Sequence, residues 1–212
     1  MPDVLRVREN LTKEFDTLEF EVAKLVETFK ATNFFGHQSN FPHAHYGYLT
    51  VCMGKIDLLS SFWTGKVGQG SDQTKRMIAF MERHLHPGKT AEHRVAVQMF
   101  RHTLMHTGAL RFLYNKNTDI RYTWRVFFGE GLSPGEHYTT TTHDPQYQDQ
   151  LMALGVSTGS TTPRVDSLNV SIELFAADVK RAITAYLDDL AADPQLQANY
   201  DLAHPKIIIQ EF

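Results

Sequence analysis

The chain has 212 residues, of which 42% are hydrophobic and 21% charged, so a single folded domain over residues 1–212 is expected and a disordered or fibrous protein is excluded. The net charge of −3 argues against a protein that coats nucleic acid through charge alone, although a local patch can still bind phosphate. Because no apolar run reaches the roughly 20 residues that cross a bilayer, and the only cysteine, Cys52, can form no internal disulfide, we expect a cytoplasmic protein without a membrane partner.

Apolar residues at helical spacing predict three helices in the first half of the chain, over residues 4–34, 44–63 and 71–85. The loop between the first two helices is rich in histidine. These histidines are close enough in sequence to bind one metal ion together, although a solvated loop is the simpler interpretation. These loop histidines are His37, His43 and His45.

Pro87 and Gly88 end the third helix, and a fourth, central helix is predicted from residue 91 to about 114. The next segments, 120–128 and 138–142, are rich in β-branched and aromatic residues. They predict an antiparallel β-hairpin inserted at 118–144.

The last part of the chain combines one strand with three helices. Residues 164–170 can add a third strand to the hairpin, and Asp144-Pro145 begins a short helix that ends at Gly155. A strong helix is predicted over 171–190, and Asp193-Pro194 begins a final short one. The expected fold class is therefore mainly α, a bundle of about five helices with a small antiparallel sheet.

Strong catalytic signatures are absent from the sequence: there is no Walker phosphate loop, no dinucleotide-binding glycine fingerprint, no GxSxG elbow and no HExxH. Cys52 lies on an apolar helix face, where a lone cysteine usually only packs. Histidine is the surplus residue, with 11 copies. His84, His86 and His93 flank the turn before the fourth helix and are interpreted as surface and helix-end residues.

Arg101, His102 and His106 stand in the middle of the predicted fourth helix. The two histidines are one turn apart, and the long arginine side chain can reach a phosphate shared with His106. A histidine can take a proton from a ribose 2′-hydroxyl, and an arginine can bind the charge that grows on the phosphate. Two histidines are only half of a metal-ligand set, so we expect no metal ion and no cofactor.

The sequence around these residues is basic, since residues 94–125 carry six arginines and lysines against one aspartate. Such a stretch in an acidic protein favours an anionic ligand, and Arg94, Arg111 and Lys116 are candidates for binding phosphate or RNA. Aromatic residues of the following strand could stack on bases, but core packing is the simpler interpretation. They are Tyr122, Trp124, Phe127 and Phe128.

An arginine, a polar residue, three further residues and a histidine, here Arg101, His102 and His106, resemble the RX4-6H motif of the HEPN superfamily. Its members are helical bundles that usually dimerise. Many are metal-independent endoribonucleases of toxin–antitoxin, abortive-infection and CRISPR-associated systems, and others are non-catalytic partners of nucleotidyltransferases. The resemblance implies a homodimer with a composite site, in which Arg101 stabilises the scissile phosphate, His106 is the general acid/base and His102 assists. It also implies an RNA substrate and an antitoxin or regulatory protein as partner.

Two other interpretations remain open. Arg101 and the histidines could form buried hydrogen bonds and a salt bridge with an acidic residue of a neighbouring helix. The protein would then be a catalytically inactive HEPN-like module that binds a partner protein or a nucleotide. Alternatively, His102, His106 and the loop histidines could form the site of a helical-bundle metalloprotein.

Overall fold

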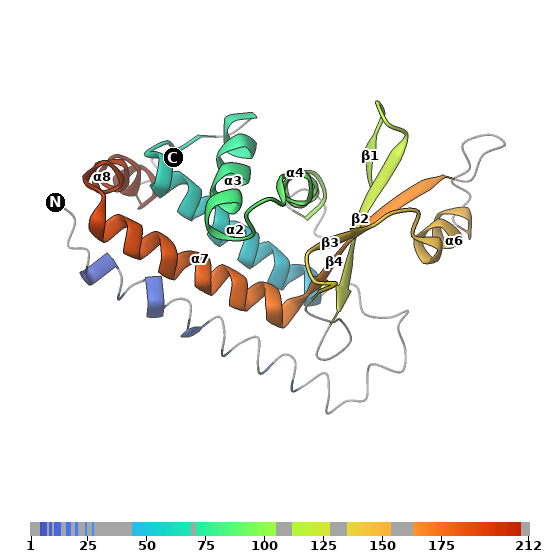
Figure 1. Cartoon of the computed structure of the whole chain (residues 1–212), viewed down its shortest axis with the longest axis horizontal. Helices are drawn as coiled ribbons and strands as arrows, with labels where there is room; N and C mark the ends of the chain where they lie inside the picture. The colour runs from blue at the N-terminus through green and yellow to red at the C-terminus, as the bar shows by residue number, and fades with distance from the viewer. Residues whose placement is uncertain are drawn as a thin grey trace.

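The computed structural model describes residues 44–68, 71–104, 112–127, 135–153 and 163–208, together with single residues and short runs between 5 and 27. It is mainly helical with a small sheet at one end of the helices, which confirms the predicted fold class (Figure 1). Among the described residues, no helix combines the length and the apolar character needed to span a bilayer. Some predicted residues lie outside the described residues, namely His37, His43, His106, Arg111, Phe128 and the side chain of His45.

Helix α2 (Ala44–Thr64) lies in the centre of the bundle and contacts α3 (Ser71–His84), α7 (Ile172–Ala192) and α8 (Pro194–Ile208). The helices predicted over 44–63, 71–85 and 171–190 are thereby confirmed. Their apolar stripes face each other and remove large side chains from water, which is the main stabilising contribution to the fold. Fully buried members of this core include Leu49, Ile56, Phe80, Phe175 and Tyr186.

Helix α4 (Thr90–Met99) is shorter than predicted. It continues as a π-helix, η2 (Phe100–Leu104), and Leu113–Asn115 is already strand β1, so the prediction of helix as far as residue 114 is wrong. The reason is a local hairpin: β1 pairs antiparallel with β2 (Ile120–Phe127), and Asp119 closes the turn in the left-handed region, with φ 54°.

The sheet has the strand order β1-β2-β4-β3, with β3 at Thr139–Thr141 and β4 at Arg164–Ser171. Strand β4 lies between the two strands that were expected to form a hairpin, and it pairs parallel with β2 and antiparallel with β3. The antiparallel hairpin of β2 with β3 therefore does not form. Nearly all of β4 is buried, as expected for a central strand, and the chain returns to it through α6 (Pro145–Ala153).

The strand aromatics are divided between core and sheet surface. Trp124 is fully buried in the core, which confirms the packing interpretation for this residue. Tyr122 packs against the same core while remaining partly buried, and Phe127 is partly exposed beneath the guanidinium of Arg125.

Strand β4 runs directly into α7, and Ser171 is both the last strand residue and the helix N-cap (Figure 1). Its hydroxyl accepts a hydrogen bond from the N–H of Leu174 at 3.4 Å. The first turns of α7 therefore start at the sheet, where the turn at 135–138 and the turn after α3 meet them.

Candidate functional site

Arg101 and His102 lie side by side in η2 but face different surroundings. Arg101 is half-buried, and its guanidinium donates a hydrogen bond to the hydroxyl of Thr74 in α3. Its positive charge also partly opposes the rise that burial causes in the pKa of Asp57 of α2. His102 is exposed. The arginine is thus directed towards α2 and α3, whereas the neighbouring histidine is directed towards solvent.

The surroundings of Arg101 form a polar cluster between α2, α3 and η2, here called the Asp57 cluster, which comprises Asp57, Gln73, Thr74, Arg76 and Arg101. The side chain of Gln73 donates to Asp57 at 2.5 Å, and the buried Arg76 lies 3.5 Å from the same carboxylate. Burial raises the pKa of Asp57, and the hydrogen bond from Gln73 and the charges of Arg76 and Arg101 only partly oppose this shift.

The other basic residues of the predicted anion-binding stretch lie on separate elements. Arg94 is exposed on α4, and Lys116 is exposed in the turn between β1 and β2. Two further arginines of this stretch interact within the sheet: Arg121 stacks over Tyr114 at 4.7 Å, and Arg125 lies 3.4 Å from the buried Asp144.

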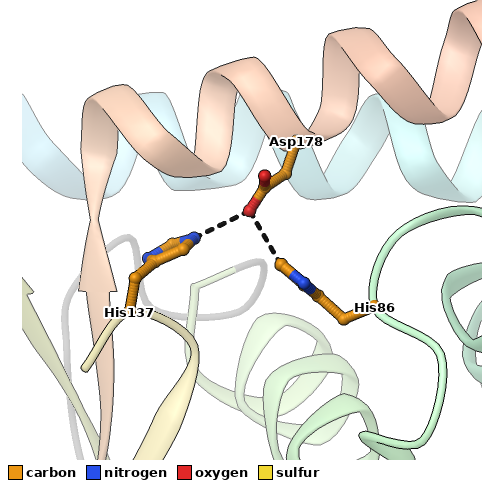
Figure 2. Close-up of side chains that lie close together, drawn as sticks. All are labelled: His86, His137 and Asp178. Carbon is orange, nitrogen blue, oxygen red and sulfur yellow. Dashed lines mark hydrogen bonds and ion pairs between the residues drawn. The ribbon is translucent and has the colours of Figure 1, made fainter. Parts of the chain in front are cut away.

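A second cluster, not predicted from the sequence, lies where α7 leaves the sheet, and Figure 2 shows its side chains. His86, His137 and Asp178 each offer one potential ligand atom, and these atoms all lie within 4.8 Å of one another. Asp178 Oδ2 is 2.7 Å from His86 Nε2 and 2.8 Å from His137 Nε2. These three residues are called the His–Asp cluster below.

His86 is held by a tight turn after α3. Its carbonyl accepts the N–H of Lys89 at 3.2 Å, with Pro87 second in the turn and Gly88 third at φ 82°. This is the geometry of a type II turn, in which the third position favours glycine. The carboxylate of Glu82 accepts the N–H of Gly88 at 2.5 Å and so ties the turn back to α3.

His93 and Tyr138 support His86 from within the core. His93 is fully buried, which corrects its interpretation as a surface residue. Its Nε2–H donates to the carbonyl of His86 at 2.9 Å, while its Nδ1 accepts the hydroxyl of Tyr138 at 3.0 Å. Burial lowers the pKa of His93 and raises that of Tyr138, so both are neutral, as these hydrogen bonds require. The Tyr138 ring also stacks on the His86 ring at 4.6 Å.

His137 and Asp178 are ordered by the start of α7. The N–H of Ser171 donates to His137 Nδ1 at 3.1 Å, so the imidazole proton lies on Nε2 and is donated to Asp178. Arg181 donates to the other carboxylate oxygen at 2.5 Å. Burial alone would raise the pKa of Asp178, but the hydrogen bond from His137 and the adjacent His86 outweigh it and hold this pKa well below its usual range. The group is therefore an anion.

The contact between His86 and Asp178 is different. Although His86 Nε2 is 2.7 Å from the carboxylate, its N–H direction does not point at the oxygen, and this buried nitrogen has no hydrogen-bond partner among the described residues. A short distance without alignment is an ionic contact and not a hydrogen bond. In the His–Asp cluster, His137 is therefore hydrogen-bonded to Asp178, whereas His86 contacts the same oxygen through charge.

The two clusters are separate sites. His86 precedes α4 and Arg101 follows it, and a helix of ten residues is about 15 Å long. The His–Asp cluster therefore supplies no group to a reaction at Arg101.

The His–Asp cluster left a partial signal in the sequence. Asp178 is an acidic residue between Phe175 and Val179 on the apolar stripe of α7, and a charge in such a position indicates a buried partner. No comparable signal marked His137, because it lies in a loop far in sequence from both of its partners.

Comparison of the chain with protein-family models, with curated proteins and with solved structures finds no match. Membership of the HEPN superfamily therefore remains a prediction from the arrangement of Arg101, His102 and His106.

Proposed function

We propose that the protein is a metal-independent endoribonuclease of the HEPN type, with a site formed by Arg101, His102 and His106 of two identical chains. The observation that carries this proposal is the π-helix at Phe100–Leu104, which contains the first two of these residues. Turns of π-helix are rare and occur frequently at functional sites. The wider turn accompanies an arginine fixed by Thr74 and a histidine open to solvent.

The proposed reaction is an attack by a ribose 2′-hydroxyl on the adjacent phosphorus. His106 accepts the hydroxyl proton, a new 2′-O–P bond forms, and the P–O5′ bond breaks as the leaving oxygen takes up a proton from water. Arg101 stabilises the charge that grows on the non-bridging oxygens. Its contact with Thr74 orients the guanidinium before RNA binds, and the exposed Arg94 and Lys116 supply weaker phosphate contacts.

The experiment is an RNA cleavage assay with the purified full chain in the presence of EDTA. His106→Asn is expected to lower the rate at least about 100-fold, since a positioned general base contributes about 10²–10⁴-fold. His143→Asn is the matched control, because His143 is an exposed histidine at φ 52°, a conformation that asparagine tolerates. An intact RNA with the wild-type protein, or equal cleavage by the His106 variant, would refute the proposal.

The dimer is tested separately by light scattering and by mixing two inactive variants. A composite site predicts a dimer and a toxin-like activity that an antitoxin or regulatory protein suppresses by covering it. A monomer at concentrations where cleavage occurs would contradict the shared site.

A second candidate is a catalytically inactive helical module that binds a partner protein. It is favoured by the hydrogen bond of Arg101 to Thr74 and by the attraction between Arg101 and the Asp57 carboxylate, because a guanidinium engaged within its own chain stabilises the fold. In that case Arg101→Ala lowers the melting temperature by several degrees and the wild-type protein leaves RNA uncut.

A further inference from the structure

We propose that His86, His137 and Asp178 form a binding site for one divalent transition-metal ion. The site is independent of the proposed nuclease, because it lies at the opposite end of α4 from Arg101 and uses none of the same residues.

The donor atoms define the class of ion. Two imidazole nitrogens and one carboxylate oxygen are the ligand set of catalytic zinc sites with three protein ligands, and of the facial sites that hold iron(II). Calcium and magnesium prefer oxygen donors alone. The cluster therefore fits Zn²⁺, Co²⁺ or Fe²⁺.

The distances are close to those of a coordinated ion. Metal–ligand bonds of about 2.1 Å place two donors about 3.0 Å apart at a right angle and about 3.4 Å apart at the tetrahedral angle. The structure has 2.7 Å from Asp178 Oδ2 to His86 Nε2 and 2.8 Å to His137 Nε2. The side chains would have to move apart by a few tenths of an ångström to admit the ion.

The contact between His86 and Asp178 is the feature of the cluster that favours a metal ion over a fully hydrogen-bonded network. In such a network the Nε2–H of His86 would point at Asp178, yet this buried nitrogen lies at contact distance without alignment and has no hydrogen-bond partner among the described residues. An imidazole nitrogen that lies against a carboxylate oxygen without a hydrogen bond between them is compatible with the binding of one ion by both atoms.

The residues around the cluster hold its ligands in place. Tyr138 stacks on the His86 ring, and Arg181 binds the Asp178 oxygen that faces away from the histidines. Tyr138 also has a φ of 55°, and a bulky residue in the left-handed region persists only where the surroundings impose it, most often at functional sites. Such support of the ligands by a second layer of residues is typical of metal sites.

The side-chain exposures show where the site is open. The side chains of His137 and Asp178 are 5% and 6% exposed, whereas that of His86 is 21% exposed. Three protein ligands leave at least one coordination position, which a water molecule or a small anion would reach from the His86 side.

Metal binding requires one hydrogen bond to be exchanged. In the metal-free protein the N–H of Ser171 donates to His137 Nδ1, which keeps the proton on Nε2. Coordination through Nε2 moves that proton to Nδ1 and releases the Ser171 N–H. The Nδ1–H then faces the Ser171 N–H, so these two donors must separate, and a buried donor without a partner costs free energy. This cost is smaller than the free energy of binding a zinc ion. The Ser171 amide is therefore a specific reporter of the ion.

The experiment uses the full chain, purified without a histidine tag and freed of metal with EDTA, which is then dialysed away. Titration with Zn²⁺ by calorimetry is expected to give one ion per chain, and Co²⁺ is expected to give the visible absorption bands of a site with nitrogen and oxygen ligands. The Ser171 amide resonance should shift on addition of Zn²⁺.

His86→Asn, His137→Asn and Asp178→Asn are each expected to weaken Zn²⁺ binding about 100-fold or more, since even the loss of a supporting residue weakens metal sites by about 10–100-fold. His143→Asn is the control for a histidine outside the cluster. Circular dichroism shows whether each variant is folded, and the cobalt spectrum and the Ser171 shift of the wild-type chain test the site even where a variant does not fold.

Absence of stoichiometric binding by the wild-type chain overturns the proposal, as does unchanged affinity in folded His86 and His137 variants. These measurements contain no RNA, and the nuclease assay is run in EDTA. A failure of one proposal is therefore distinguishable from a failure of the other.

Discussion

Replacement of Asp178 by alanine is the most direct test of how the start of α7 is held. The carboxylate is almost fully buried and accepts hydrogen bonds from His137 at 2.8 Å and from Arg181 at 2.5 Å. Asp178→Ala leaves the buried Nε2–H of His137 without an acceptor. Breaking a buried charged interaction by removing one partner lowers the free energy of unfolding by about 3–5 kcal/mol. Because Arg181 is exposed and its ion pair with Asp178 is weakened by water, we expect a decrease near the lower limit, about 3 kcal/mol.

Two variants separate the effect of the charge from that of helix composition. Asp178→Asn keeps an oxygen for His137 and loses the charge, so its loss of stability should be about half as large, roughly 1–2 kcal/mol. Asp188→Ala removes an exposed aspartate from the same helix and should change stability by less than about 0.5 kcal/mol. For a chain of this size, about 3 kcal/mol corresponds to a decrease in melting temperature of roughly 6–12 °C.

The pH dependence has a definite sign. Because the pKa of Asp178 in the folded protein is lower than in the unfolded chain, the carboxylate stabilises the fold above the unfolded-state pKa of about 4. That stabilisation is lost as the pH falls from there towards the folded-state pKa. Denaturant unfolding in EDTA at neutral and acidic pH measures it. The reasoning would be refuted if Asp178→Ala lost no more free energy of unfolding than Asp188→Ala, or if its loss were the same at acidic and at neutral pH.

Three further predictions concern the surroundings of the clusters and the core. Tyr138→Phe removes the hydroxyl that His93 Nδ1 accepts and should lower the free energy of unfolding by about 1–3 kcal/mol, measured with urea. Gly88→Ala should lower the free energy of unfolding by about 1–2 kcal/mol, because Gly88 has a φ of 82°. In Gly68→Ala the added Cβ also meets no atom within 4 Å, but the φ is ordinary, so the decrease should be much smaller. Equal decreases in the two variants would show that the turn has another conformation. Burial raises the pKa of the Cys52 thiol to about 12, so alkylation should be slow in the folded protein at mildly alkaline pH and fast after unfolding, and rapid labelling of the native chain would contradict its burial.

The helices could be predicted from the sequence because their signals are local. Apolar spacing and capping residues lie within each helix, and Asp144 and Asp193 accept backbone N–H groups at the starts of α6 and α8 as their sequence positions suggest. The end of α4 was missed because Leu113 and Tyr114 fit an apolar helix face and a strand equally well, and only their pairing with β2 decides between them.

The order of the strands could not be predicted for a related reason. Nothing local in 164–170 specifies a parallel partner. Strand β4 lies in the interior of the sheet, beside β2, and its nearly complete burial suits an interior position better than an edge. The same limitation applies to the His–Asp cluster. Asp178 was recognisable as an acidic residue in an apolar stripe, but its partners come from two loops that only the folded chain brings together.

Hydrogen bonds near each of the two clusters join α3 to the segment α4–η2, at opposite ends of that segment. Glu82 and His93 tie α3 and α4 together beside His86, and the contact of Arg101 with Thr74 ties η2 to α3 at the far end. Each end is held by its own hydrogen bonds, and substitutions separated by more than about 10 Å without shared partners have nearly additive effects on stability. A variant of the His–Asp cluster therefore reports on metal binding and on the start of α7, whereas a variant of Arg101 reports on the nuclease proposal.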